Sequence, residues 1–532
     1  MTRKVLALIL ALAMLIPTVA MGEAADKYGK YEEPITLTFL TKDEKSTEVQ
    51  YNADNPDRKS AHENAWITAY KDYLNIEIKR EIAEDSTALN ARLNTGMATG
   101  DLPDVMIVPK DMFYVLAENG VLQDLSGAYE NYANKNLLQV GVDAWNGVLE
   151  TGMWEGELLG FPMMPNSFNS TQVLWIRQDW LDKVGMEAPK TIDELIAVGK
   201  AFMDAKLGGD NAYAWGSASD PFSPIFAAYG SVYKESGDVW VETADGKYVY
   251  GGVNVEPNKA ALLAMQEMYK AGLLSKDIAV SDGKVLAEDV ANDRVGMIFG
   301  EGWLGATTIK TSNVNNENAD WIAVRIPTLT GEDVDQWTNA TIGSFIVVNS
   351  ECKNPKAIFK MLELELNIYY AATPEESAKL YLCEDGYAIW NFRIFRNWTY
   401  PTQDFMRAEE CIAGKAAGLT EVTPFSNANY QRMLQGLNNQ RDQVGFARVM
   451  LQAYPVIDAL NKAGHLVPEY AGPTTENMTL YRNNINQALA SAMYKVVLGE
   501  DISVYEKAVE TWYASGGQAI TDEVNAYYAA NK

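Results

Sequence analysis

The alternation of apolar and polar positions predicts a regular succession of strands and helices in the first part of the chain. Pro34–Thr41 and Leu102–Pro109 are predicted as strands, and Ile76–Ile82 alternates as a half-buried strand does. One helix, with Trp66 and Tyr70 on its apolar face, separates the first two strands, and residues 86–100 form a second. This β-α-β-α-β order predicts a parallel sheet with helices on its faces.

The middle of the chain repeats this pattern after a break. Gly156–Ser167 predicts a short hairpin leading into a crossing marked by prolines, and Thr171–Gly185 begins as a strand and becomes a helix. A further helix begins with a capping box, in which Thr191 and Glu194 satisfy each other's backbone amides. Later strands and a mainly helical region from Pro355 onward complete an arrangement of two α/β lobes between which the chain crosses more than once.

The N-terminus carries the pattern of a secretory signal peptide over residues 1–22. Arg3 and Lys4 precede an apolar run from Val5 to Ile16, and a region of small residues follows. The run is shorter than the roughly 20 residues that span a bilayer. No Cys occurs before Cys352, so the acceptor residue of a bacterial lipid anchor is absent. The sequence predicts an exported protein that is extracellular or on the cell surface.

Composition excludes several classes of function. The net charge of −27 is spread along the 532 residues, whereas nucleic-acid binding needs clustered Lys and Arg. Only His62 and His465 are present, and no G-x-S-x-G or H-E-x-x-H motif occurs. We therefore expect no catalytic residues, no metal site and no cofactor, although the 71 acidic residues leave chance carboxylate pairs open. Three cysteines without a C-x-x-C pair predict no disulfide framework.

Gly300–Gly305 reads GEGWLG after a predicted strand, and this motif has two interpretations. A dinucleotide site needs an acidic residue about 20 positions on, at the end of the next strand, but Asp320 precedes that strand. We expect instead a glycine-flexed loop that presents Trp303 to a cleft. The alternative is a structural turn in which Trp303 serves packing.

The stretch LWIRQDWLDKVG places Trp175 and Arg177 on one face of a strand, just after the crossing between lobes. Trp180 falls at helical spacing and is predicted as core. We expect Trp175 and Arg177 to contact a ligand, and the alternative is that Arg177 pairs with Asp179 or Asp182 on a solvated face.

Four motifs in this order resemble one known family. They are LNTGMATGDLPDVMIV, GELLGFPMM, LWIRQDWLDKVGMEAPKTIDELIAVGKAF and NDRVGMIFGEGW. Together they resemble the family 1, sugar-binding type of extracellular solute-binding proteins of ABC importers, and the chain's length and ending resemble the long lipoprotein-type oligosaccharide branch. The resemblance implies a periplasmic-binding-protein type II-like fold with two α/β lobes, joined by crossing segments, around a ligand cleft. Lobe 1 would comprise residues 31–163 plus 343–385, and lobe 2 residues 164–342 plus 386–532.

The resemblance implies a monomeric receptor that closes on an oligosaccharide and delivers it to the transmembrane subunits of an ABC permease. Sugars offer an apolar face for aromatic rings and hydroxyls for a few polar groups. The candidate ligand-binding residues are Lys42, Trp145, Asn166, Trp175, Arg177, Trp215, Trp303, Trp390 and Glu476. Some long members bind calcium, but the stretch holding Asp204 and Asp210 lacks the D-x-D-x-D spacing. A secreted lyase or hydrolase and a peptide-binding protein remain the alternatives.

Overall fold

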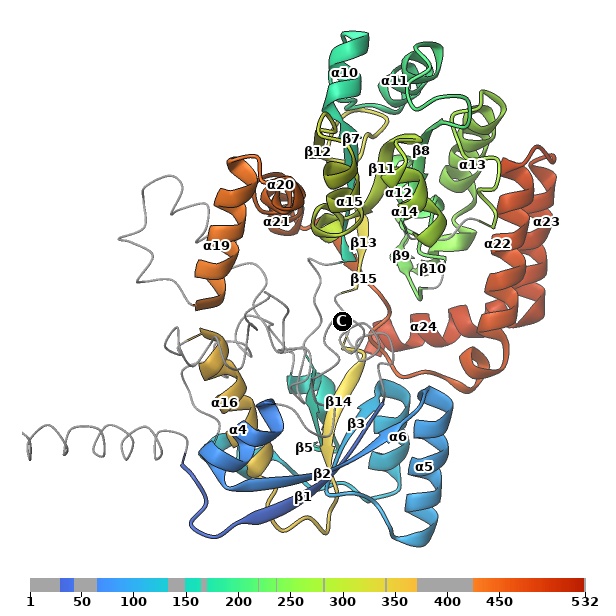
Figure 1. Cartoon of the computed structure of the whole chain (residues 1–532). Coiled ribbons are helices and arrows are strands. Elements are labelled where there is room, and N and C mark those ends of the chain that lie inside the picture. The colour runs from blue at the N-terminus through green and yellow to red at the C-terminus, as the bar shows by residue number, and fades with distance from the viewer. Residues whose placement is uncertain are drawn as a thin grey trace, which may run out of the picture. The chain divides into compact units, whose positions relative to one another are not determined.

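The computed structural model describes residues 29–42, 65–132, 149–163, 170–218, 220–235, 237–280, 283–339, 342–370 and 424–530. Its described residues fall into two compact units (Figure 1). Unit 1 holds residues 29–163 and 342–370, and unit 2 holds residues 170–339 and 426–530. The predicted lobe boundaries were placed near residues 163, 343 and 385. The last of these lies outside the described residues.

Unit 1 is built on a five-stranded sheet with the order β2-β1-β3-β14-β6. The pairings of β1 with β2 and β3 are parallel, as predicted, whereas β14 runs antiparallel to both β3 and β6. The strands are β1 (Ile35–Lys42), β2 (Ile76–Ala83), β3 (Val105–Pro109), β6 (Gly160–Pro162) and β14 (Ser344–Val348). The chain thus returns to unit 1, after passing through unit 2, to add β14 between β3 and β6.

Helices of unit 1 pack their apolar faces on this sheet around Phe39, Phe113 and Phe345, which are almost fully buried. These helices are α4 (Ala65–Leu74), α5 (Ser86–Thr99), α6 (Lys110–Glu118), α7 (Ser126–Tyr132) and α16 (Ala357–Tyr370). The predicted hairpin lies earlier than expected, between β4 (Met153–Trp154) and β5 (Glu157–Leu158). Glu155 and Gly156 both have positive φ, which makes the tight turn there.

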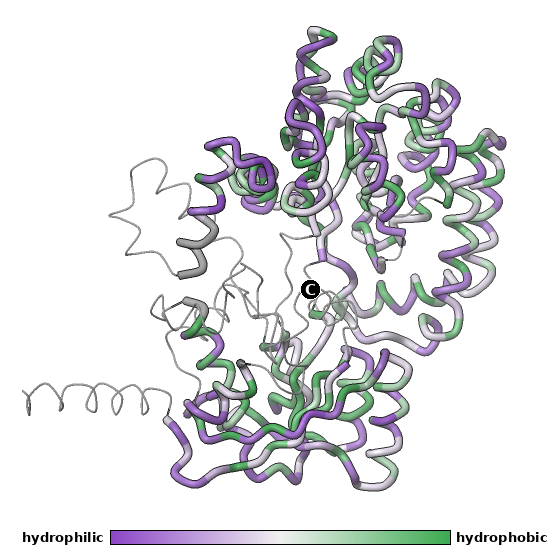
Figure 2. The backbone as a smooth tube through the Cα atoms, viewed as in Figure 1, coloured by the Kyte–Doolittle hydropathy of each residue, from purple (hydrophilic) through white to green (hydrophobic). Residues whose placement is uncertain are grey.

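Unit 2 is built on a four-stranded sheet with the order β12-β7-β11-β8. β11 runs parallel to β8 and antiparallel to β7. The strands are β7 (Gln172–Arg177), β8 (Tyr213–Ser217), β11 (Val295–Glu301) and β12 (Trp321–Val324). All six residues of β7 are buried, because apolar clusters cover both faces of the sheet. Figure 2 shows apolar segments along the strands, with hydrophilic and apolar segments alternating along outer helices such as α22 and α23.

Two helices of unit 2 begin as the sequence predicts. The strand of β7 passes directly into α10, and Thr191 and Glu194 form the predicted capping box of α11. The helices are α10 (Gln178–Val184), α11 (Ile192–Asp204), α12 (Phe222–Ala228), α13 (Val255–Lys270), α14 (Gly283–Ala291), α15 (Thr308–Asn315), α20 (Arg441–Arg448), α21 (Tyr454–Ala463), α22 (Asn483–Val497), α23 (Ser503–Trp512) and α24 (Gln518–Ala530). α19 (Pro424–Leu437) precedes α20.

Short elements complete unit 2. β9 (Trp240–Glu242) pairs with β10 (Tyr248–Tyr250), and β13 (Gln336–Thr338) pairs with β15 (Leu466–Pro468). The 3₁₀ helices η2 (Gly251–Val253) and η3 (Gly302–Ala306) follow β10 and β11, and the π-helical turns are η6 (Val449–Ala453), η7 (Met478–Arg482) and η8 (Tyr513–Gly517). Within the described ranges, no helix has both the length and the apolar character needed to cross a membrane.

Candidate functional site

One edge of the unit 2 sheet gathers polar side chains from several segments. The carboxyl ends of β8 and β11 lie there beside the first residue of β7, because Phe299 pairs with Ser217 and Glu301 with Gln172. In open α/β sheets, ligands bind outside the carboxyl ends of the strands. We name this surface the acidic edge. It comprises Asp220, Lys234, Glu235, Asp238, Glu301, Trp337, Glu469 and Arg482.

Lys234 lies at the centre of the acidic edge. Its side chain is 12% exposed, and its ammonium nitrogen is 3.1 Å from Asp220 Oδ2 and 5.0 Å from the centre of the Trp337 ring. Asp220 also accepts a hydrogen bond from the Ser223 backbone amide at the start of α12. Trp337 donates through Nε1 to Glu469 Oε1 at 3.2 Å. Segments far apart in the sequence therefore converge on one lysine.

A second ion pair extends the acidic edge toward α22. Arg482 donates to Asp238 at 2.8 Å, and Asp238 also accepts from Trp240 Nε1. Glu235 accepts a hydrogen bond from the Tyr494 hydroxyl at 3.0 Å. Glu235, Asp238 and Arg482, together with Glu469, line a cavity of about 410 Å³. That volume lies within the range of small-molecule pockets.

Three carboxyl groups of the acidic edge are harder to ionise than usual. Burial raises the pKa of Glu301, with the nearby Lys234 charge partly opposing the shift. Burial also raises the pKa of Glu235, and in Glu469 burial acts together with the negative charge of Asp238 to raise the pKa. Perturbed carboxyl groups beside a cavity are typical of functional sites.

Trp303 lies in η3, two residues after Glu301 of the acidic edge, which ends β11. It is 38% exposed, which is unusual for so large an apolar side chain. A Cβ added at Gly305 would lie 2.5 Å from the Gly445 carbonyl oxygen, and one at Gly445 would lie 1.9 Å from the Gly305 carbonyl oxygen. Gly305 and Gly445 therefore let the backbones of η3 and α20 come into direct contact, next to Trp303 in the sequence.

Three other candidate residues lie in the interior of unit 2. Trp175 is fully buried and donates through Nε1 to the Glu301 carbonyl oxygen. Trp215 is 1% exposed and packs edge-on against Phe299. Arg177 is 1% exposed and makes two hydrogen bonds to Asp179. Strand alternation placed the β7 side chains on their correct faces, but helices cover both faces of the sheet. We therefore leave these three residues out of the proposed site.

Arg177 forms a closed ionic cluster with its neighbours. Besides Asp179, it donates to Asp293 at 2.5 Å, and its guanidinium lies 5.0 Å from the Trp180 ring and 5.7 Å from the Trp321 ring. Trp180 is 2% exposed, as predicted for a core residue. The pairing with Asp179 is thus the one that the alternative interpretation named, but it lies in the interior rather than on a solvated face.

The remaining candidates are dispersed. Lys42 ends β1 in unit 1, is exposed and donates to Ser86 Oγ at 3.4 Å. Glu476 is exposed at the helical position two residues before η7. Trp145, Asn166 and Trp390 lie outside the described residues. Among the candidates within the described residues, Trp303 combines partial exposure with a position two residues after Glu301 of the acidic edge.

Sequence reasoning missed the residues of the acidic edge itself. Asp220, Lys234, Trp337 and Glu469 belong to separate segments, and none lies in a recognisable motif. The available signal was the position of Asp220 shortly after a strand end, where α/β sheets place their ligands.

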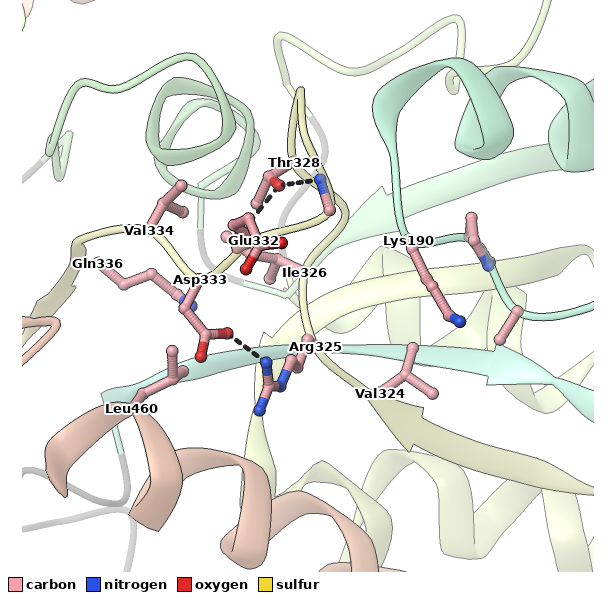
Figure 3. A pocket seen from close by; sticks show the side chains of 13 residues that line it. Lys190, Val324, Arg325, Ile326, Thr328, Glu332, Asp333, Val334, Gln336 and Leu460 are labelled. Carbon is pink, nitrogen blue, oxygen red and sulfur yellow. Dashed lines mark hydrogen bonds and ion pairs between the residues drawn. The ribbon is translucent and has the colours of Figure 1, made fainter. Parts of the chain in front are cut away.

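A second cavity, of about 340 Å³, lies between residues 188–190, residues 324–336 and α21 (Figure 3). Figure 3 shows Arg325 directed toward Asp333, and their charged atoms are 2.7 Å apart. Its lining is mainly apolar, with Val324, Ile326 and Leu460. It therefore offers less hydrogen bonding than the acidic edge.

Metal-binding groups are not assembled in the described part of the chain, where no three His, Cys, Asp or Glu side chains are grouped to hold an ion. Asp204 and Asp210 are both exposed. Cys352 is a free, buried thiol, and burial raises its pKa to about 11. Cys383 and Cys411 lie outside the described residues.

Comparison with known proteins identifies relatives of this chain. The chain is 23% identical to Lipoprotein LipO of Bacillus subtilis over 88% of its length and 89% of that protein. It is 26% identical to the polygalacturonan/rhamnogalacturonan-binding protein YtcQ of the same species, over 81% of this chain and 82% of that one.

A solved structure shares the fold. It is the Streptococcus pneumoniae ABC-transporter substrate-binding protein FusA in complex with kestose, with a TM-score of 0.60 at 17% identity, covering 94% of this chain and all of that one. The sequence profile described as "Bacterial extracellular solute-binding protein" matches residues 53–364. The chain therefore belongs to the bacterial extracellular solute-binding protein family.

Proposed function

We propose that this protein is the receptor of an ABC importer, captures an oligosaccharide by lobe closure and delivers it to the transmembrane subunits of a permease. The observation that supports this most is the acidic edge, together with the partly exposed Trp303 two residues after Glu301. An exposed aromatic ring and a set of hydrogen-bond acceptors suit the apolar face and the hydroxyl rim of a sugar.

The relatives support a carbohydrate ligand. One relative is named for binding polygalacturonan and rhamnogalacturonan, and another was solved with kestose. The first of these ligands is acidic and the second is neutral, so relatedness alone does not choose between them. The signal-peptide pattern of residues 1–22 supports export, and we propose a monomer outside the cytoplasm that acts by binding rather than by catalysis.

Calorimetry of the purified protein against a panel of oligosaccharides tests this proposal, with each mixture assayed afterwards for new reducing ends and unsaturated products. Micromolar or tighter binding with intact sugar is the expected result. New ends or an unsaturated product would establish the lyase or hydrolase alternative instead. If peptides give a heat of binding and none of the sugars does, the ligand is a peptide.

A further inference from the structure

We propose that the oligosaccharide is uncharged, and that the acidic edge selects against chains of uronic acid. This inference rests on the proposed function, because it specifies the class of ligand for the same site. It follows from the pairing of charges around Lys234 and Arg482.

Both cations of the acidic edge already have an anionic partner. Lys234 lies 3.1 Å from Asp220, whose side chain is 3% exposed, and Arg482 lies 2.8 Å from Asp238. A uronate carboxylate that bound here would have to compete with a carboxylate that is covalently part of the protein. Recognition of a carboxylate uses an arginine or lysine whose donors are available, typically in a two-pronged contact. Within the described residues, the acidic edge offers no such cation.

The other carboxyl groups strengthen this bias. Glu235, Glu301 and Glu469 add three acidic groups to two ion pairs that are already neutral. If the three are ionised, the edge has an excess of negative charge, and a like charge brought against it costs several kcal/mol. If they are protonated, the edge is neutral and still lacks a free cation. Neither state gives a net attraction for a uronate.

Neutral hydroxyl groups fit the same surface. A hydroxyl donates to a carboxylate oxygen and accepts from an ammonium or amide group, so it can join either ion pair without adding charge. Trp337 and Trp303 supply rings for the apolar face of a sugar. The amides of Asn483 and Gln487 line the same cavity and can both donate and accept.

A matched pair of ligands isolates the effect of charge. Oligogalacturonides of one length are compared in titration calorimetry as the free acid and as the full methyl ester, beside neutral fructo-, arabino- and malto-oligosaccharides and an oligomer of glucosamine. We expect the tightest binding from a neutral sugar, with an affinity that changes little between low and high salt. Above the raised pKa values of Glu235, Glu301 and Glu469, where these groups are ionised, the free acid should bind at least about a hundredfold more weakly than its ester, which corresponds to the cost of a like charge.

Charge-removing variants locate the selectivity. The double variant Glu235→Gln/Glu301→Gln keeps the shape of both side chains. In this variant the ratio of the dissociation constants of the free acid and the ester should fall about tenfold or more. The control Glu187→Gln/Glu510→Gln removes the same charge from two exposed positions, in the loop after α10 and on α23, and should leave the difference unchanged. An equal change in both double variants would overturn the assignment to the acidic edge.

The outcomes separate this inference from the proposed function. Free uronate binding as tightly as the ester or the neutral sugars would refute the inference while leaving a carbohydrate receptor. Preference for the glucosamine oligomer would refute it equally, in favour of a cationic sugar. No binding of any carbohydrate would refute the proposed function and the inference together.

Discussion

Arg177 and Lys234 are both ion-paired cations of unit 2 with little solvent exposure, but their surroundings differ. Arg177 is 1% exposed, is paired with Asp179 and Asp293, and has its guanidinium close to two tryptophan rings, at 5.0 and 5.7 Å from their centres. Lys234 keeps some exposure, has Trp337 on one side and faces carboxyl groups that line a cavity. The first cluster stabilises the fold, whereas the second has the features of a binding site. Burial of a charge alone does not distinguish the two uses.

The largest expected effect comes from breaking the closed cluster. Arg177→Leu leaves Asp179 and Asp293 without their main cation, and breaking a buried pair by removing one partner costs about 3–5 kcal/mol. We expect a large fall in the free energy of unfolding, measured by urea denaturation. Sugar affinity of the remaining folded protein should be close to wild type. A variant of normal stability, or one that loses sugar binding while folded, would contradict the structural role.

Lys234→Met should affect both stability and binding. Asp220 loses its ionic partner at 3% exposure but keeps the hydrogen bond from the Ser223 backbone amide, so we expect a cost of about 1–3 kcal/mol in stability. Affinity for the oligosaccharide should fall about tenfold or more, since the central donor of the acidic edge is gone. Lys507→Met, at an exposed position on α23, is the control that should change neither quantity. Unchanged affinity would remove Lys234 from the site.

Trp303→Ala tests the aromatic part of the site. The ring is 38% exposed, so its loss should change the free energy of unfolding little. If it stacks on a sugar, affinity should fall by about 1–2 kcal/mol, from the apolar area that binding no longer buries. Leu263→Ala, at an exposed apolar residue of α13, is the matched control. Equal affinities of Trp303→Ala and wild type would favour the packing interpretation.

Glu301→Gln should change how stability depends on pH. The folded-state pKa of Glu301 is raised, so the unfolded chain ionises this group first as the pH rises above about 4.5. The wild type then loses stability until the pH passes the raised pKa, whereas the variant does not. The variant should therefore gain on the wild type over that window, by up to about 1.4 kcal/mol for each pH unit between the two pKa values. Parallel stability curves from pH 4 to 8 would show that Glu301 is not perturbed.

The sequence predicted the elements better than the site, and β7 shows why. Its alternation correctly predicted that Trp175 and Leu174 point to different faces of the sheet, because side-chain direction is a local property of a strand. Whether the second face is exposed depends on helices from other parts of the chain, and these bury Trp175. An alternating pattern therefore predicts which face of the sheet a side chain lies on, but not whether other elements cover that face.

The residues of the acidic edge could not be predicted from local sequence patterns, for a related reason. Lys234 and Asp220 are 14 positions apart, but Trp337 and Glu469 join them only through the pairing of β13 with β15. No motif marks such a convergence in a single sequence. Trp303 could be proposed from the sequence because its glycine-rich segment directly follows a recognisable strand.

The contact between Gly305 and Gly445 has a consequence for engineering. Grafting residues 300–306 alone, in order to alter which sugar the receptor binds, would transfer only one side of this backbone contact. The other side, Gly445, belongs to a helix 140 positions later in the sequence. A library that randomises residues 300–306 should therefore keep both glycines or recombine the α20 segment together with the loop.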